Sequence, residues 1–253
     1  MNEDLLKKEA AHFRLECGFN NSEPIRLKSL LQKRGVLTVF KPLSDAFSGM
    51  ALKIARPDGD DFWRFMLVNS NQSLGKQHFT ICHELYHLYV QPNFTSQVSY
   101  VERFNKKADP VEYQADVFAS YLLLPEDGLL MHVPDEDLRA GRVTLRTLLY
   151  IEQLYSCSRR VLVRRLRERK LIHKDDEAVF LQNVRRSAWE HGYSTSLYEP
   201  GNNDVVIGGY GSLARTLYDK EVISQSHYYA LLHDLGVDFS GLESQSDEAD
   251  YLD

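Results

Sequence analysis

The first 35 residues contain two runs that are typical of helices, LLKKEAAHFRLECG and PIRLKSLLQKRG. A glycine ends each run, and glycine commonly follows the last residue of a helix. The chain is therefore predicted to begin with two short helices.

Three β-type runs follow, over residues 36–41, 49–55 and 63–68. Between the last two, RPDGDD combines proline, aspartate and glycine, which indicates a hairpin turn. We expect these runs to form a small antiparallel sheet. An edge strand of such a sheet could pair with an extended peptide, through backbone groups from Ser48 to Lys53.

The segment HFTICHELYHLYV at 78–90 would be apolar on most faces of a helix, which predicts a buried helix ended by the proline that follows. The polar stretch 91–107 lacks clear periodicity and is expected to be a loop near the mouth of a cleft. Beyond it, DPVEYQADVFASYLLLPED has helical apolar spacing, with Asp109 as N-cap and Pro110 in the first turn.

Residues 136–172 have a different pattern from the segments before them. One leucine-rich run is broken at SCS and followed by a second run that contains Val161, Leu162 and Leu166. Two helices separated by a short break are typical of a helix-turn-helix.

The remainder of the chain is predicted to be helical around AVFLQNVRRSAWEHG, to turn at YEPGNND, and to form two further helices that meet near residues 222–224. The tail ESQSDEADYLD is acidic and has few apolar residues, which predicts disorder.

The composition is that of an ordinary globular protein: 253 residues, 43% hydrophobic, 26% charged, with a net charge of -6. No apolar run approaches the roughly eighteen residues of a membrane span, and the charged N-terminus lacks the apolar region of a signal peptide. Three scattered cysteines fit a reducing compartment. We expect a cytoplasmic protein without membrane contact.

The candidate chemistry lies in His83-Glu84-Leu85-Tyr86-His87. Histidines four apart share one face of a helix, so both can reach one zinc ion, and Glu84 can reach the open side of the metal. This is the H-E-x-x-H arrangement of metallopeptidases. A bare match also occurs on surface helices with two solvated histidines. The apolar surroundings here favour a buried site, where such polar groups need partners.

A catalytic zinc ion usually has three protein ligands, so one more is required. In the next predicted helix, Glu112 lies in the first turn and Asp116 lies one turn later on the same face. We predict Glu112 as the third ligand and Asp116 as the acceptor that holds one histidine, His83, through its other ring nitrogen. Alternatively, a first-turn glutamate can have no role beyond the favourable interaction of its negative charge with the helix dipole. An unpaired Asp116 among apolar neighbours, however, would be costly.

From Phe47 to Pro125 the chain resembles the ImmA/IrrE-type metallopeptidases of bacteria and their mobile elements. The matching segments are, in order, FSG at 47–49, FMLVNS at 65–70, HFTICHELYHL at 78–88 and EYQADVFASYLLLP at 112–125. The resemblance implies zinc as the cofactor, with His83, His87 and Glu112 as ligands and Glu84 as the catalytic base.

Two positions depart from the pattern of that family. Its members commonly have glycine where this chain has Tyr86, which could narrow the cleft beside the metal. They often have asparagine where this chain has Asp116, and an aspartate there can still support a histidine. Candidates for stabilising the oxyanion are Tyr86, Tyr89 and His78.

The predicted fold class is α+β. Residues 1–130 are expected to form a mostly helical, zincin-like peptidase domain with a small antiparallel sheet. Residues 131–175 are expected to form a helix-turn-helix-like segment. Residues 176–253 are expected to form a helical C-terminal region, regulatory or partner-binding, with an acidic tail.

The resemblance implies a zinc-dependent endopeptidase that cleaves a helix-turn-helix transcriptional repressor and so derepresses mobile-element or stress-response genes. One alternative is a zinc-stabilised DNA-binding or partner-binding regulator without essential proteolysis. Another is a latent toxin-system component controlled by residues 177–253.

DNA is a candidate partner through the basic second helix, by way of Arg159, Arg160, Arg164 and Arg165. A solvated helix face, or a dock for an acidic partner, would give the same charge pattern.

Overall fold

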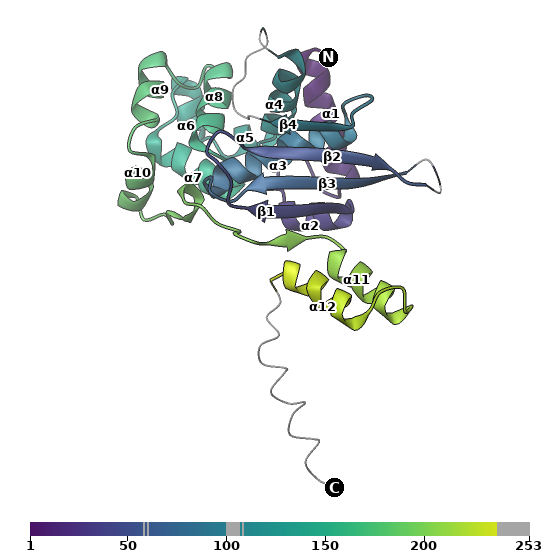
Figure 1. Cartoon of the computed structure of the whole chain (residues 1–253). Helices are drawn as coiled ribbons and strands as arrows, with labels where there is room; N and C mark the ends of the chain where they lie inside the picture. The colour runs from purple at the N-terminus through teal and green to yellow at the C-terminus, as the bar shows by residue number, and fades with distance from the viewer. Residues whose placement is uncertain (58, 60, 100–106, 108, 237–253) are drawn as a thin grey trace, which may run out of the picture.

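The computed structural model describes residues 1–57, 59, 61–99, 107 and 109–236. In this part of the chain, helices pack against a five-stranded sheet with the strand order β4-β2-β3-β1-β5 (Figure 1). The α+β class predicted from the sequence is confirmed.

The helices of the N-terminal half are α1 (Glu3–Glu16), α2 (Leu27–Lys33), α3 (Leu74–Tyr89) and α4 (Pro110–Leu123). Gly18 and Gly35 follow α1 and α2 with φ of 83° and 65°, the left-handed conformation that commonly ends a helix. Arg14 is fully buried, and its guanidinium donates a hydrogen bond to the carbonyl of Leu122 at 2.6 Å. This bond ties α1 to the end of α4.

The strands are β1 (Val36–Lys41), β2 (Gly49–Ala55), β3 (Phe62–Asn69), β4 (Ser96–Ser99) and β5 (Val206–Ile207). The three strands predicted from the sequence are present. β2 and β3 pair in antiparallel fashion, as the hairpin turn requires, but β1 pairs with β3 in parallel. The sheet is therefore mixed, and the expectation of an antiparallel sheet is wrong for the pair of β1 and β3.

Asn69, at the end of β3, gives the physical reason. Its side-chain amide donates to the carbonyls of Ser44 at 2.9 Å and Phe47 at 2.8 Å, and its Oδ1 accepts from the N–H of Leu43 at 3.0 Å. These bonds hold the connection between β1 and β2 across the end of β3. The chain thus passes over β3 before β2 begins, and β1 and β2 lie on opposite sides of it.

β4 lies in the stretch predicted to be a loop, which corrects that prediction for residues 96–99. It pairs with β2 from Gly49↔Ser99 to Leu52↔Ser96. Its polar sequence, SQVS, has no apolar alternation that could reveal a strand. Because β2 is paired on both sides, its backbone is not a free edge, and the expectation that Ser48 to Lys53 would pair with a substrate is wrong. Residues 100–106 and 108 of the predicted loop lie outside the described residues.

The two faces of the sheet differ. On the inner face, which packs against α3, Ala51, Met66 and Val68 are fully buried. On the opposite face, here called the outer face, the side chains are only half-buried, because alternate residues of a strand point to opposite sides. The outer-face residues of this kind are Leu37, Val39, Met50, Leu52, Phe65 and Leu67.

The middle of the chain forms α5 (Glu126–Met131), α6 (Asp135–Ala140), α7 (Leu145–Tyr155) and α8 (Arg159–Glu168). Ser156, with φ of 50°, turns the chain between α7 and α8, and Ser158 caps α8 by accepting a hydrogen bond from Val161 N–H. The two helices and the break predicted from the sequence are present. Leu162 and Leu166 of α8 are fully buried.

The C-terminal elements are α9 (Lys174–Phe180), α10 (Val184–Glu190), η1 (Ser196–Tyr198), α11 (Tyr210–Asp219) and α12 (Gln225–Asp234). The helical run expected around AVFLQNVRRSAWEHG is divided by Asn183, which has φ of 45°. β5, which the sequence did not reveal, pairs with β1. The domain limits at 130 and 175 remain a prediction. In the described part of the chain, no helix combines the length and apolarity needed to span a membrane.

The linker between η1 and β5 is fastened to the start of α3. The N–H of Leu74 donates to the carbonyl of Glu199 at 2.9 Å, and the side chain of Gln77 donates to the carbonyl of Gly201 at 3.0 Å. The N-cap side chain of α3 makes no capping hydrogen bond. The linker therefore supplies a partner for a first-turn N–H that has none within the helix.

Candidate metal centre

Three side chains from two helices converge on one point. The Nε2 atoms of His83 and His87, both on α3, lie 3.1 Å apart. Glu112 of α4 places Oε2 3.2 Å from Nε2 of His83 and Oε1 3.2 Å from Nε2 of His87. Ligand atoms of all three lie within 4.8 Å of one another. The structure thus brings together the three residues that the sequence predicted as ligands.

The position of Glu112 follows from how α4 begins and packs. Asp109 accepts a hydrogen bond from the N–H of Glu112 at 3.1 Å, and Pro110 occupies the first turn, so the start of the helix is fixed as predicted. Ala115 and Ala119 are fully buried. Their small side chains let α4 pack closely on α3, which carries the two histidines.

The donor set fits zinc. Imidazole nitrogen and carboxylate oxygen bind zinc at about 2.0–2.2 Å, so neighbouring ligands of a tetrahedral site lie roughly 3.3 Å apart. The measured separations, 3.1 Å and 3.2 Å, are close to this value. The burial of both histidines also fits a bound zinc ion, since buried polar groups require partners.

Each histidine is held through its other ring nitrogen. Nδ1 of His83 lies 2.9 Å from Oδ1 of Asp116, and Nδ1 of His87 contacts Oε1 of Gln91. Both oxygens accept a hydrogen bond, so each Nδ1 carries a proton and each Nε2 is the nitrogen that faces Glu112 and could bind a metal ion. Asp116 lies beside His83, as predicted. The contact of Gln91 was not predicted, because Gln91 follows the helix in a stretch without a recognisable pattern.

The electrostatics of the site favour positive charge at its centre. Burial acts to lower the pKa of the His83 imidazole, but the hydrogen bonds with Asp116 and Glu112 raise it to about 10. Burial acts to raise the pKa of Glu112, yet the hydrogen bonds with the two histidines lower it to about 2. The anionic Glu112 carboxylate would be stabilised by a cation held between it and the two imidazoles.

Glu84 is a further titratable group of the site and is fully buried. Its carboxylate faces the hydroxyl of Ser99 on β4, which acts to lower its pKa, and no other hydrogen-bond partner is present among the described residues. Burial raises the pKa of Glu84 above its ordinary value, although His83 and His87 act in the opposite direction. A carboxyl group in this environment takes up a proton more readily than one in water, which suits general acid–base chemistry near neutral pH.

Gly49 of β2 leaves room for the Glu84 carboxylate. A Cβ atom at position 49 would lie 3.0 Å from Oε1 of Glu84 and 2.5 Å from Cγ2 of Thr80. Steric crowding therefore explains why position 49, in the FSG segment, is a glycine. The sequence pattern identified this glycine only as part of a motif. Phe94 adds a second unpredicted contact, because its ring stacks on His87 with centroids 5.3 Å apart.

The three residues considered for the oxyanion are engaged in other contacts. The hydroxyl of Tyr86 donates to Oε1 of Gln114 at 3.2 Å, and that of Tyr89 donates to the carbonyl of Arg34 at 2.8 Å. Nδ1 of His78 lies 2.8 Å from a backbone carbonyl in the turn between α7 and α8. These contacts favour none of the three for the oxyanion role.

Two arginines of the basic helix α8 lie inside the protein. Arg159 is 3% exposed, and its Nη2 lies 2.7 Å from Oε2 of Glu152. Arg165 is fully buried, with Nη2 2.7 Å from Oε2 of Glu126. Because these guanidinium groups neutralise carboxylates of the same chain, they are not placed to contact DNA phosphates.

The other two arginines named for DNA contact lie nearer the surface. Arg164 pairs with Glu168 at 2.8 Å, and Arg160 is exposed. DNA binding remains a prediction that depends on these two residues.

A family model matches the part of the chain that carries the metal centre. The model of the IrrE N-terminal-like domain, Peptidase_M78, covers residues 31–167, which is more than half of the chain and includes both α3 and α4. A comparison with curated proteins found no match. Because the family match includes the three converging side chains and the helices that hold them, the chain belongs to the Peptidase_M78 family of metallopeptidases.

Proposed function

We propose that this protein is a zinc-dependent endopeptidase. His83, His87 and Glu112 hold the ion, Asp116 orients His83, and Glu84 is the catalytic base. Membership of a metallopeptidase family supports the reaction class, and the convergence of three ligand side chains supports the metal-binding set. The choice of zinc rests on the mixture of nitrogen and oxygen donors and on their spacing.

The residues of the site divide the work of peptide hydrolysis. A zinc ion bound by these ligands supplies Lewis acidity, which activates water and polarises the scissile carbonyl. Glu84 takes the proton of the attacking water and passes it to the leaving amine. Asp116 and Gln91 keep the two imidazoles in a fixed tautomer and orientation.

The observation that carries this proposal is the burial of Glu84 with little hydrogen bonding to its carboxylate. A buried carboxylate with a structural role is normally hydrogen-bonded, because an unpaired buried charge is costly. Within the described residues, the hydroxyl of Ser99 is the one hydrogen-bonding group beside Glu84, which lies next to two candidate ligands. A carboxylate kept available in this way suits a group that exchanges protons with a substrate and with water.

Replacing Glu84 by glutamine tests the catalytic claim. We expect Glu84→Gln to retain one equivalent of metal and its thermal midpoint but to lose roughly 10²–10⁴-fold in cleavage rate. Metal content is measured by atomic absorption, and cleavage by mass spectrometry of a substrate. Glu136→Gln, at an exposed position of α6, is the matched control and should cleave normally. Undiminished cleavage by Glu84→Gln would remove the catalytic role.

For the substrate, we propose a helix-turn-helix transcriptional repressor whose cleavage derepresses mobile-element or stress-response genes. The resemblance to ImmA/IrrE-type proteins supports this choice, and such a substrate implies action in the cytoplasm. The test incubates the protein with candidate repressors, with and without a chelator. Chelator-sensitive fragments that Glu84→Gln does not produce are expected. Fragments that persist with chelator would contradict the proposal.

The second candidate function is a DNA-binding or partner-binding regulator without essential proteolysis. The two-helix arrangement of α7 and α8 favours it, and the buried ion pairs of Arg159 and Arg165 count against it. A gel shift that weakens in Arg160→Ala and Arg164→Ala variants would support this function. A repressor cut at full rate by the same variants would separate it from proteolysis.

A further inference from the structure

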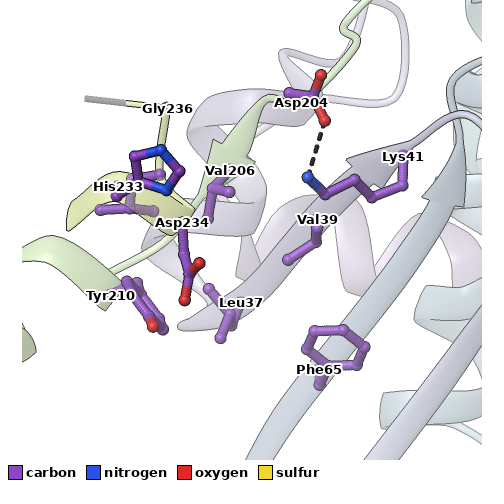
Figure 2. Close-up of a pocket in the computed structure, with 11 residues that line it drawn as sticks. Leu37, Val39, Lys41, Phe65, Asp204, Val206, Tyr210, His233, Asp234 and Gly236 are labelled. Carbon is purple, nitrogen blue, oxygen red and sulfur yellow. Dashed lines mark hydrogen bonds and ion pairs between the residues drawn. The ribbon is translucent and has the colours of Figure 1, made fainter. Parts of the chain in front are cut away.

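The outer face of the sheet carries a cavity of about 630 Å³, on the side of the sheet opposite α3. Leu37, Val39 and Phe65 point into it from the strands, and Tyr210, His233 and Asp234 lie across from them (Figure 2). The volume lies in the range of sites that enclose a ligand or several side chains.

The strand wall of this cavity is mostly apolar and incompletely covered, and its lysine, Lys41, is paired with Asp204. Leu37 and Phe65 are register partners on β1 and β3 and are only half-buried. The apolar surface continues along the same face to Ile54 and Trp63, which are 48% and 51% exposed. An apolar surface that remains open to water favours a covering segment.

Gly236 places the end of the described chain at this cavity. It lines the cavity and follows α12 with φ of 76°, and its N–H donates to the carbonyl of His233 at 2.8 Å. A glycine in this conformation ends a helix, so the chain changes direction here. The sequence continues as VDFSGLESQSDEADYLD.

The first six of these residues contain three apolar side chains, Val237, Phe239 and Leu242. In an extended backbone, alternate side chains point to the same side. Val237 and Phe239 would then face the sheet together, while Asp238 would face water. At up to about 3.6 Å per residue, Phe239 lies within roughly 11 Å of Gly236.

We propose that this cavity is the docking site of the chain's own segment 237–242, with Phe239 as the anchor in contact with Val39 and Phe65. The tether favours this occupant, because a segment attached at the cavity mouth has an effective concentration of about a millimolar or more. The remainder of the tail is acidic, without lysine or arginine, and is not part of the proposed contact.

Cysteine cross-linking tests the proposal in the full-length chain. The natural cysteines, Cys17, Cys82 and Cys157, are all buried, so introduced surface thiols react selectively. In the double variant Val39→Cys, Phe239→Cys, mild oxidation should give an intrachain disulfide in most molecules, because docking brings the two Cβ atoms near the roughly 4 Å that a disulfide requires. The product is identified by peptide mapping.

The matched control pairs Val39→Cys with Tyr251→Cys, which leaves the proposed segment intact and places the thiol in the acidic part of the tail. We expect little intrachain disulfide in that control. Equal cross-linking from positions 239 and 251 would indicate random collision and would overturn the proposal. A disulfide-linked dimer would also overturn it, by making a second copy the occupant.

A second measurement uses no cysteine. Phe239→Ser should increase the fluorescence of an apolar dye that binds the exposed sheet face, whereas Tyr251→Ser should leave it unchanged. Because both substitutions lie in the tail, neither is expected to unfold the domain. An unchanged signal in Phe239→Ser would contradict docking.

Discussion

At the scale of single residues, the geometry of the candidate metal centre depends on the small residue Gly49 as well as on the charged side chains. The close approach of Gly49 to Thr80 and Glu84 leaves no room for a side chain between β2 and α3. Glu84 therefore keeps its position because the neighbouring strand lacks a Cβ atom at that point.

Gly49→Ala should destabilise the protein by about 1–3 kcal/mol, the usual cost of overpacking, and should displace the Glu84 carboxylate, reducing cleavage. Urea unfolding and cleavage assays measure the two effects. Gly59→Ala is the matched control, because a Cβ atom there would meet nothing within 4 Å. Equal stability of the two variants would show that β2 can move away without cost.

Asp116 gives a second prediction. Asp116→Ala should weaken metal binding by about 10–100-fold, because His83 loses the acceptor that fixes its tautomer. Asp116→Asn keeps an acceptor oxygen and should lose less. Competition with a fluorescent zinc chelator measures both variants. Equal losses in the two would assign the role of Asp116 to its charge rather than to its hydrogen bond.

The convergence of the candidate ligands could be predicted from the sequence because their spacing is local. His83 and His87 are separated by one helical turn, and Glu112 and Asp116 are separated in the same way on the next helix. Gln91 and Phe94 support His87 from a segment without periodicity, so no pattern pointed to them. The steric role of Gly49 depends on two elements meeting in space, which a single sequence does not show.

At the scale of elements, helices and the hairpin were easier to predict than strand order. The turn residues of the hairpin connect neighbours in the chain, so β2 and β3 could be paired in advance. The parallel pairing of β1 depends on Asn69, a single side chain that fastens a connection some 25 residues away in the sequence. β4 pairs with β2, but its sequence, SQVS, has no apolar alternation that could reveal a strand.

The N-terminus of α9 provides a pH-dependent prediction. Hydrogen bonds from Arg142 hold the pKa of Asp176 below its ordinary value, and Nη2 of Arg142 lies 2.7 Å from Oδ1 of Asp176. A carboxyl group with a depressed folded-state pKa stabilises the fold above its unfolded pKa of about 3.9, and this contribution is lost as the pH falls through the folded value.

Asp176→Asn should therefore lower the urea midpoint at pH 7, and its difference from the native chain should shrink below about pH 4. Asp175→Asn, at the exposed neighbouring position, is the control and should have little effect at either pH. A deficit in Asp176→Asn that is the same at both pH values would show that the charge of Asp176 does not matter.

At the scale of the whole molecule, a metal ion would join two helices that are separated by a strand and a long connection. Removing it with a chelator should lower the thermal midpoint, because ligand binding stabilises the folded state by about 4 kcal/mol at a thousandfold excess over Kd. Calorimetry with and without EDTA measures this shift. Glu112→Gln should show a much smaller one. An equal shift in that variant would mean that the chelated ion binds elsewhere.

The attachment of the linker at residues 199–201 to Leu74 and Gln77 bears on the order in which the protein can mature. A nascent chain is synthesised from its N-terminus, so both helices that carry the candidate ligands leave the ribosome well before this linker does. Until then, the first turn of α3 lacks the carbonyl partners that the linker provides. A prematurely terminated product would contain every candidate ligand yet hold α3 less firmly, so the candidate metal centre gains its full support only after residues 199–201 have been translated.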